Sequence, residues 1–126
     1  MLVSPVYVAF FALILVALSV RTLRLRRQLR VAIGHGNEPE LERAVRVHAN
    51  FCEYVPITLL LIYLLETIAG SPYWIHVLCI GLLMGRIVHA YGVSQVSENY
   101  RYRVIGMALT FTVIISASVG IFLVYV

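Results

Sequence analysis

The residues of this sequence most able to do chemistry lie in RVHANFCEYVP, residues 46–56, at the head of an otherwise apolar stretch. Because an α-helix advances about 100° per residue, Arg46, Asn50 and Glu53 fall within an arc of roughly 60° on one helix face. Ionisable groups are costly in the hydrocarbon of a bilayer, so they usually face a protein interior or a wet cavity and mark a site. This polar stripe therefore predicts a functional site inside a membrane-type helix.

The stripe lies in the second of four long apolar stretches, each near or above the roughly 20 residues that span hydrocarbon. The chain has 126 residues, of which 61% are hydrophobic and 13% are charged, whereas about a quarter are charged in soluble domains. We expect a single integral membrane domain over residues 1–126, an all-α four-helix bundle protomer. The apolar pattern predicts helices at about 2–30, 39–68, 73–95 and 102–126.

The distribution of basic residues predicts how these helices cross the membrane. All ten basic residues are arginines, and five of them crowd RTLRLRRQLR at the end of the first stretch. By the positive-inside rule this end is cytoplasmic. The turn near Gly70, Ser71 and Pro72 carries no charge, whereas the last connection, SQVSENYRYR, is charged. We therefore expect the first and third connections on the cytoplasmic side and both termini on the opposite side.

Composition argues against several kinds of partner. No nucleic-acid motif is present, and the net charge of +4 lies mainly in the first connection, where it sets topology and can contact anionic membrane lipid. Cys52 and Cys79 have no CxxC spacing, so neither a disulfide nor a zinc site is indicated. We interpret both as buried packing thiols and expect no metal.

In a four-helix bundle, polar groups from all four helices meet at the cytoplasmic level. They are Arg26, Arg27 and Arg30, then Arg46, Asn50 and Glu53, then Arg86, His89 and Tyr91, and finally Arg101 and Arg103. Taken alone, the pair at positions 46 and 53 could be an internal ion pair, and the arginines at 21–30 could be a solvated cluster. Together they suit a ligand with several carboxylates, an ammonium and a reactive atom, as in glutathione. The glutathione thiol attacks as a thiolate, and a nearby guanidinium favours this form by lowering the pKa of the thiol.

The segment ELERAVRVHANFCEYVP resembles the second-helix signature of the MAPEG family, the membrane-associated proteins of eicosanoid and glutathione metabolism. The family pattern is close to E-R-x-x-R-x-x-x-N-x-x-E-x-x-P, and every specified position is matched here by Glu42, Arg43, Arg46, Asn50, Glu53 and Pro56. The resemblance covers nearly the whole chain. It implies a four-helix protomer assembled as a homotrimer, with glutathione bound between neighbouring protomers near the cytoplasmic side.

Carried over by position, the resemblance implies glutathione contacts at Arg27, Arg30, Arg46, His48, Asn50, Glu53, Tyr54, His89, Tyr91 and Arg101, with Arg26 as an alternative in the first helix. His48 lies on the opposite helix face from Asn50, but the family has a histidine or glutamine at this position that also reaches the ligand, and a neighbouring protomer supplies the rest of the site. The catalytic, thiolate-stabilising arginine corresponds to Arg103 in RVIG, and Arg101 is its competitor. This sequence departs from the family at Val93, where the family has a tyrosine, and its third connection is a few residues longer than in the eukaryotic synthases.

The sequence therefore predicts a bacterial-type, inner-membrane glutathione transferase or peroxidase that acts in detoxification. It would add glutathione to a lipophilic electrophile taken from the bilayer, or use it to reduce a lipid hydroperoxide. Two alternatives stay open. A small four-span proton-coupled transporter would use Glu53, although such proteins favour a lone glutamate with few arginines nearby. A catalytically silent scaffold of the same fold is the other, and Val93 keeps it open.

Overall fold

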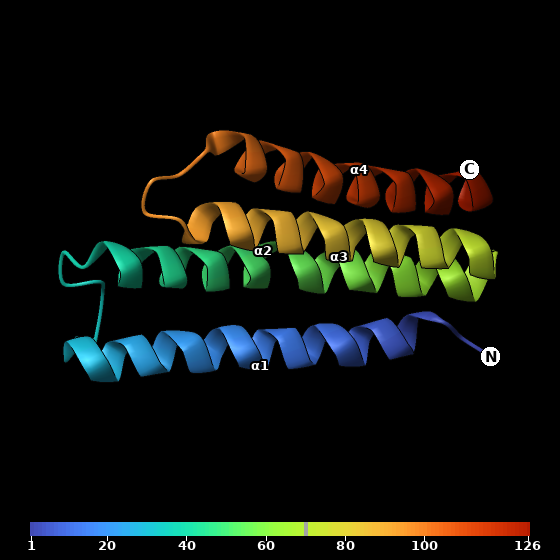
Figure 1. The fold of residues 1–126 in the computed structure, drawn as a ribbon. Helices are drawn as coiled ribbons and strands as arrows, with labels where there is room; N and C mark the ends of the chain where they lie inside the picture. Colours follow the sequence, from blue (N-terminus) through green and yellow to red (C-terminus); the bar gives the residue numbers. More distant parts are fainter. Residues whose placement is uncertain (70) are drawn as a thin grey trace.

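The computed structural model describes residues 1–69 and 71–126 and shows four long helices in an antiparallel bundle (Figure 1). They are α1 (Ser4–Leu29), α2 (Pro39–Ile68), α3 (Pro72–Ser94) and α4 (Tyr100–Tyr125). Each helix is long and apolar enough to cross a membrane. The predicted all-α membrane bundle is therefore confirmed. Of the uncharged turn between α2 and α3, Gly70 lies outside the described residues.

Local sequence explains where the helices begin and end. A proline stands in the first turn of α1, α2 and α3, where its missing amide hydrogen removes no helical hydrogen bond. Glu40 and Glu42 occupy the first turn of α2, at the positive end of the helix dipole. The side chain of Asn99 caps α4 by accepting from the backbone N–H of Arg101 at 3.1 Å. At the end of α1, Arg30 takes a left-handed conformation that stops the helix.

The two middle helices separate the two outer ones. In Figure 1, α1 and α4 lie on opposite sides of α2 and α3, and the described residues of α1 make no contact with those of α4. Both termini lie at one end of the bundle, and the connections α1–α2 and α3–α4 lie together at the other end. This second end, which we call the connection end, collects the arginine-rich segments of the sequence.

The apolar core is held mainly by α2 and α3, and glycines allow α3 and α4 to approach each other closely. Phe51, Ile62 and Leu82 are buried in this core. A Cβ added at Gly106 of α4 would lie 2.7 Å from the carbonyl oxygen of Gly85 of α3, so these two backbones touch. Gly81 and Gly85, four residues apart on α3, both face α4 and so permit this close packing.

The two cysteines differ, and one prediction was wrong. Cys79 is buried, as expected, but Cys52 is exposed. Cys52 follows the buried Phe51 by one residue, which turns it about 100° away from the core. In a membrane bundle, lipid covers the outer faces of the helices. A residue inside an apolar stretch of sequence, such as Cys52, is therefore not necessarily buried inside the protomer.

Candidate functional site

A polar groove of about 360 Å³ lies near the connection end, between α2, α3 and α4. It is lined by residues of the sequence-predicted site and their neighbours, namely Glu42, Arg46, Asn50, His89, Val93, Arg103 and Met107. The structure therefore brings together four predicted site residues from three helices. We call this the polar groove.

The ion pair considered between Arg46 and Glu53 is present but loose. Arg46 Nη2 lies 3.9 Å from Glu53 Oε1, and the two side chains are 57% and 52% exposed. Exposed pairs of this kind contribute little to stability, at most about 1 kcal/mol. Both charges are thus available to a ligand or to another protein surface.

Asn50 is held from behind by a buried arginine. Arg86 of α3 is 3% exposed and donates from Nη1 to Asn50 Oδ1 at 2.5 Å. Its Nη2 donates to Thr110 Oγ1 of α4 at 2.6 Å, while its Nε has no hydrogen-bond partner among the described residues. Arg86 thus joins α2, α3 and α4 at the depth of Asn50.

Arg103 is held in the groove by an acidic residue of the third connection. The side chain of Glu98 is 2% exposed and lies between two guanidiniums. Arg103 Nη2 donates to Glu98 Oε2 at 2.8 Å, and Arg103 Nε lies 2.8 Å from Oε1. Arg43 of α2 forms an ion pair with the same carboxylate and also donates to the carbonyl oxygen of Val93 at 3.3 Å. Glu98 therefore fixes the start of α4 against the ends of α2 and α3.

Three other predicted contacts, His48, Arg27 and Arg30, lie on the other side of α2. His48 faces α1, where its Nε2 is 2.9 Å from Ser19 Oγ. Arg27 and Arg30 lie at the end of α1, next to Arg26, whose Nη1 donates to the carbonyl oxygen of Gly34 at 2.8 Å. A helix with its side chains is about 10 Å wide, so α2 separates this set from the polar groove within one protomer.

Four further predicted residues lie outside the lining of the polar groove. Glu53 lies beside Arg46 on α2. Tyr54 packs edge-on against Phe111 of α4, with ring centroids 5.6 Å apart. Tyr91 packs edge-on against Tyr102 at 5.3 Å. Arg101 is exposed on the first turn of α4. Between the two competing arginines, the geometry therefore places Arg103 in the groove and Arg101 outside it.

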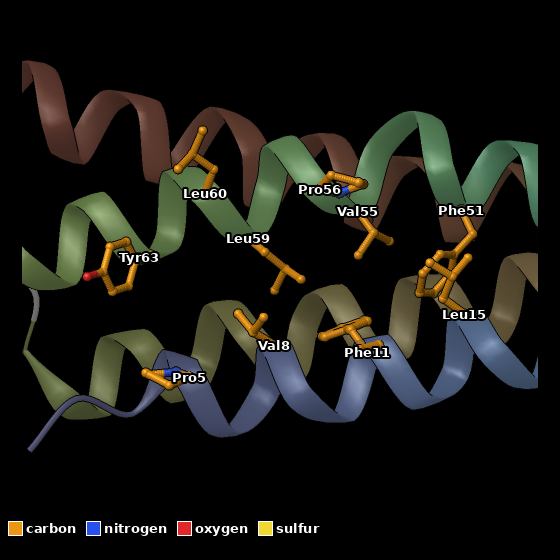
Figure 2. A pocket seen from close by; sticks show the side chains of 11 residues that line it. Pro5, Val8, Phe11, Leu15, Phe51, Val55, Pro56, Leu59, Leu60 and Tyr63 are labelled. Carbon is orange, nitrogen blue, oxygen red and sulfur yellow. The ribbon is translucent and has the colours of Figure 1, made fainter.

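A second hollow, almost wholly apolar, opens between α1 and α2 (Figure 2). Its volume is about 520 Å³. Figure 2 shows Val8 and Phe11 of α1 facing Val55 and Leu59 of α2, with Pro56 at the rim. Both walls belong to membrane-type helices, so lipid or a lipophilic molecule can reach this hollow from the bilayer.

Sequence reasoning counted Arg86 among the polar groups at the cytoplasmic level but gave it no contact of its own, and it gave no role in the site to Glu98. The sequence did contain an indication for Arg86, because an arginine well inside an apolar stretch costs free energy in a membrane and usually marks a functional site. Glu98 stands beside two arginines of an exposed-looking connection, and its burial follows from the approach of α2, which sequence alone does not show.

Comparison with known proteins shows the family of this chain. The model of the MAPEG family matches residues 4–123. The inner membrane protein YecN, from two strains of Escherichia coli, is 38% identical over 109 residues, which are 86% of this chain and 82% of YecN. No solved structure matches this chain.

Proposed function

This chain is a membrane protein of the MAPEG family, and from that premise we propose that it is a glutathione-dependent transferase or peroxidase. Glutathione binds at a boundary between protomers of a homotrimer. Arg103 stabilises the thiolate, which attacks a lipophilic electrophile or reduces a lipid hydroperoxide.

The observation that carries the proposal is the division of the predicted contacts into two half-sites. Arg46, Asn50, His89 and Arg103 belong to the polar groove, whereas His48 and the arginines of α1 face the other side of α2. A single ligand cannot reach both sets across a helix about 10 Å wide. Two neighbouring protomers, one offering each half-site, can enclose one ligand, and a ring of three closes such head-to-tail contacts.

The charges of the groove suit this ligand. Arg46 is poorly paired and exposed, so it is free to bind a carboxylate of glutathione, and Glu53 is free to bind its ammonium. Arg103 offers a guanidinium near the same groove, which favours the thiolate over the thiol. His89 is buried and lines the same groove. The apolar hollow between α1 and α2 offers a route from the bilayer for the oily co-substrate.

The decisive experiment measures binding and chemistry separately. In detergent, the purified protein is titrated with glutathione and with glutathione sulfonate, then assayed with a chlorodinitrobenzene-type electrophile and an organic hydroperoxide. Arg103→Ala should lower the rate by about 100-fold, as loss of one charge-stabilising donor does. Arg101→Ala is the matched control and should retain most of the rate. Absence of glutathione binding at millimolar concentration would end the proposal.

A silent scaffold is the second candidate, because Val93 lines the polar groove with an apolar side chain where the family pattern has a tyrosine. A scaffold of this kind would form normal helical oligomers that ignore glutathione. A proton-coupled transporter has less support here, since Glu53 is half exposed and lies beside Arg46. Loss of proton-driven efflux in Glu53→Gln would favour it.

We further propose an inner-membrane location, as in the name of the relative YecN, with the connection end in the cytoplasm. The arginines of residues 21–30 support this orientation by the positive-inside rule. A reporter fused after Val126 that is active only outside the cytoplasm should be active. A reporter inserted at Gly34 should be inactive.

A further inference from the structure

Arg86 is a charged group whose place in the fold calls for a function. It stands eight residues before Ser94, the last residue of α3, and so lies about 12 Å from the helix end at 1.5 Å per residue. An arginine at the centre of a membrane helix costs about 3 kcal/mol on insertion scales. No carboxylate pairs with it in residues 1–69 and 71–126. Its strongest contacts are instead neutral acceptors, Asn50 and Thr110.

We propose that Arg86 is a positioning residue that fixes the amide of Asn50, so that Asn50 presents only hydrogen-bond donors to the polar groove. The inference rests on the proposed function and adds the chemistry of one ligand group. That group is an acceptor oxygen, either a carbonyl or a carboxylate, and neither an amide N–H nor an ammonium.

The hydrogen-bond donors and acceptors of Arg86 and Asn50 fix the orientation of the Asn50 amide. A guanidinium has donors only, so the side-chain oxygen of Asn50 must face Arg86. This oxygen is then engaged at 2.5 Å, and the amide nitrogen, with its two N–H groups, is left for the groove. A flipped amide would set donors against donors in a buried place, which is strongly unfavourable.

The position of Arg86 is itself fixed from the opposite side. Its Nη2 donates to Thr110 Oγ1 at 2.6 Å, and this hydroxyl donates in turn to the carbonyl oxygen of Gly106 at 2.9 Å. The guanidinium therefore cannot turn away from Asn50 without losing its anchor on α4. Arg46 and Arg103 of the groove also carry donors only, whereas Glu42 is an acceptor, so it is the part of the groove around Asn50, Arg46 and Arg103 that recognises oxygen acceptors.

A simple structural clamp between helices is the competing explanation for Arg86. Asn50→Asp separates the two, because it keeps Arg86 and gives it a carboxylate partner at the same place. We expect Asn50→Asp to fold with a thermal midpoint equal to or above that of the natural protein. Its affinity for glutathione, measured by calorimetry in detergent, should fall at least about tenfold, since an oxygen replaces the donor that faced the ligand.

A double-mutant cycle tests whether Arg86 acts through Asn50. We expect Asn50→Ala and Arg86→Met each to weaken glutathione binding by about tenfold, the worth of one hydrogen bond. The combined variant should bind within about twofold of Asn50→Ala alone. A clamp that merely shapes the bundle would lower affinity whether or not Asn50 is present. Size-exclusion chromatography and circular dichroism verify that each variant is folded.

The outcomes distinguish this inference from the proposed function. If the natural protein does not bind glutathione, the proposed function fails and the inference fails with it. If it binds, and Asn50→Asp binds equally well, the ligand offers a donor at this position and the inference is wrong while the function stands. Additive losses of about 100-fold in the combined variant would also overturn it. Should Arg86→Met not fold, the Asn50→Asp result decides alone.

Discussion

Replacing Glu98 by glutamine should lower the pKa of a thiol bound against Arg103. The carboxylate of Glu98 is almost completely buried and touches the guanidiniums of both Arg103 and Arg43. Its negative charge therefore offsets part of the positive charge that would stabilise a thiolate. Glutamine keeps the shape, and its oxygen in the place of Oε2 can still accept from Arg43 and Arg103, while only the contact of Oε1 with Arg103 Nε is lost. Without the negative charge, Arg103 becomes a stronger partner for an anion.

The size of the effect follows from the geometry. A thiolate on the open side of the Arg103 guanidinium would lie roughly 6 Å from the Glu98 carboxylate, because the guanidinium separates the two anions. At an effective dielectric constant of about 20, two unit charges at this distance repel by about 3 kcal/mol. Arg103 is 43% exposed, so we take about half of this value to allow for solvent screening. Since about 1.4 kcal/mol corresponds to one pH unit, the thiol pKa should fall by about 1.

The assay follows thiolate absorbance in the ultraviolet as a function of pH, using glutathione-saturated protein in detergent. In Glu98→Gln, the thiolate should form at lower pH, and the acidic limb of the conjugation rate should move down by the same amount. Glu40→Gln is the matched control, because it removes an exposed carboxylate from the first turn of α2. A thiol pKa in Glu98→Gln that is unchanged or higher than in the natural protein would refute the reasoning.

Two further substitutions probe the framework that holds the site. Gly106→Ala would place a Cβ 2.7 Å from both the carbonyl oxygen of Gly85 and the backbone nitrogen of His89. It should therefore destabilise the protein by about 1–3 kcal/mol in thermal unfolding. The control Gly81→Ala, whose Cβ meets only a side chain, should destabilise the protein less. Equal stability of the two variants would contradict this packing. Glu66→Gln replaces a carboxylate whose two oxygens accept from two backbone N–H groups at the start of α1, so it weakens this cap of the helix. We expect a loss of about 1 kcal/mol and faster hydrogen exchange at the start of α1, and unchanged exchange would count against the role of this cap.

The fold was accessible from sequence because a bilayer leaves few choices. Four apolar stretches of sufficient length predict four helices, since a helix satisfies its own backbone hydrogen bonds in hydrocarbon. The spacing of Arg46, Asn50 and Glu53 predicted one polar helix face. Arg46 and Asn50 line the groove, whereas Glu53 lies beside Arg46 outside its lining. His48, two residues from each, was placed on the other face, and the structure shows it bonded to α1.

Contacts between helices were harder to foresee. The bond between Arg86 and Asn50 and the ion pairs of Glu98 join residues 36, 55 and 5 positions apart. Helical periodicity gives the face of each residue but leaves open which helix that face meets and at what height. The choice between Arg101 and Arg103 is of this kind, because both stand on the first turns of α4 and only the packing of that helix selects one. Cys52 shows the complementary error, since lipid can cover an apolar face as well as protein does.

Among the residues of α1, Ser4 and Phe11 are buried within the protomer. The bundle therefore places few demands on the outer surface of this helix, and substitutions there should leave the folding of a lone chain nearly unaffected. If natural variants nevertheless kept particular side chains along that surface, the constraint would have to come from a neighbouring molecule. The positions of the retained side chains would then show which part of α1 that molecule contacts.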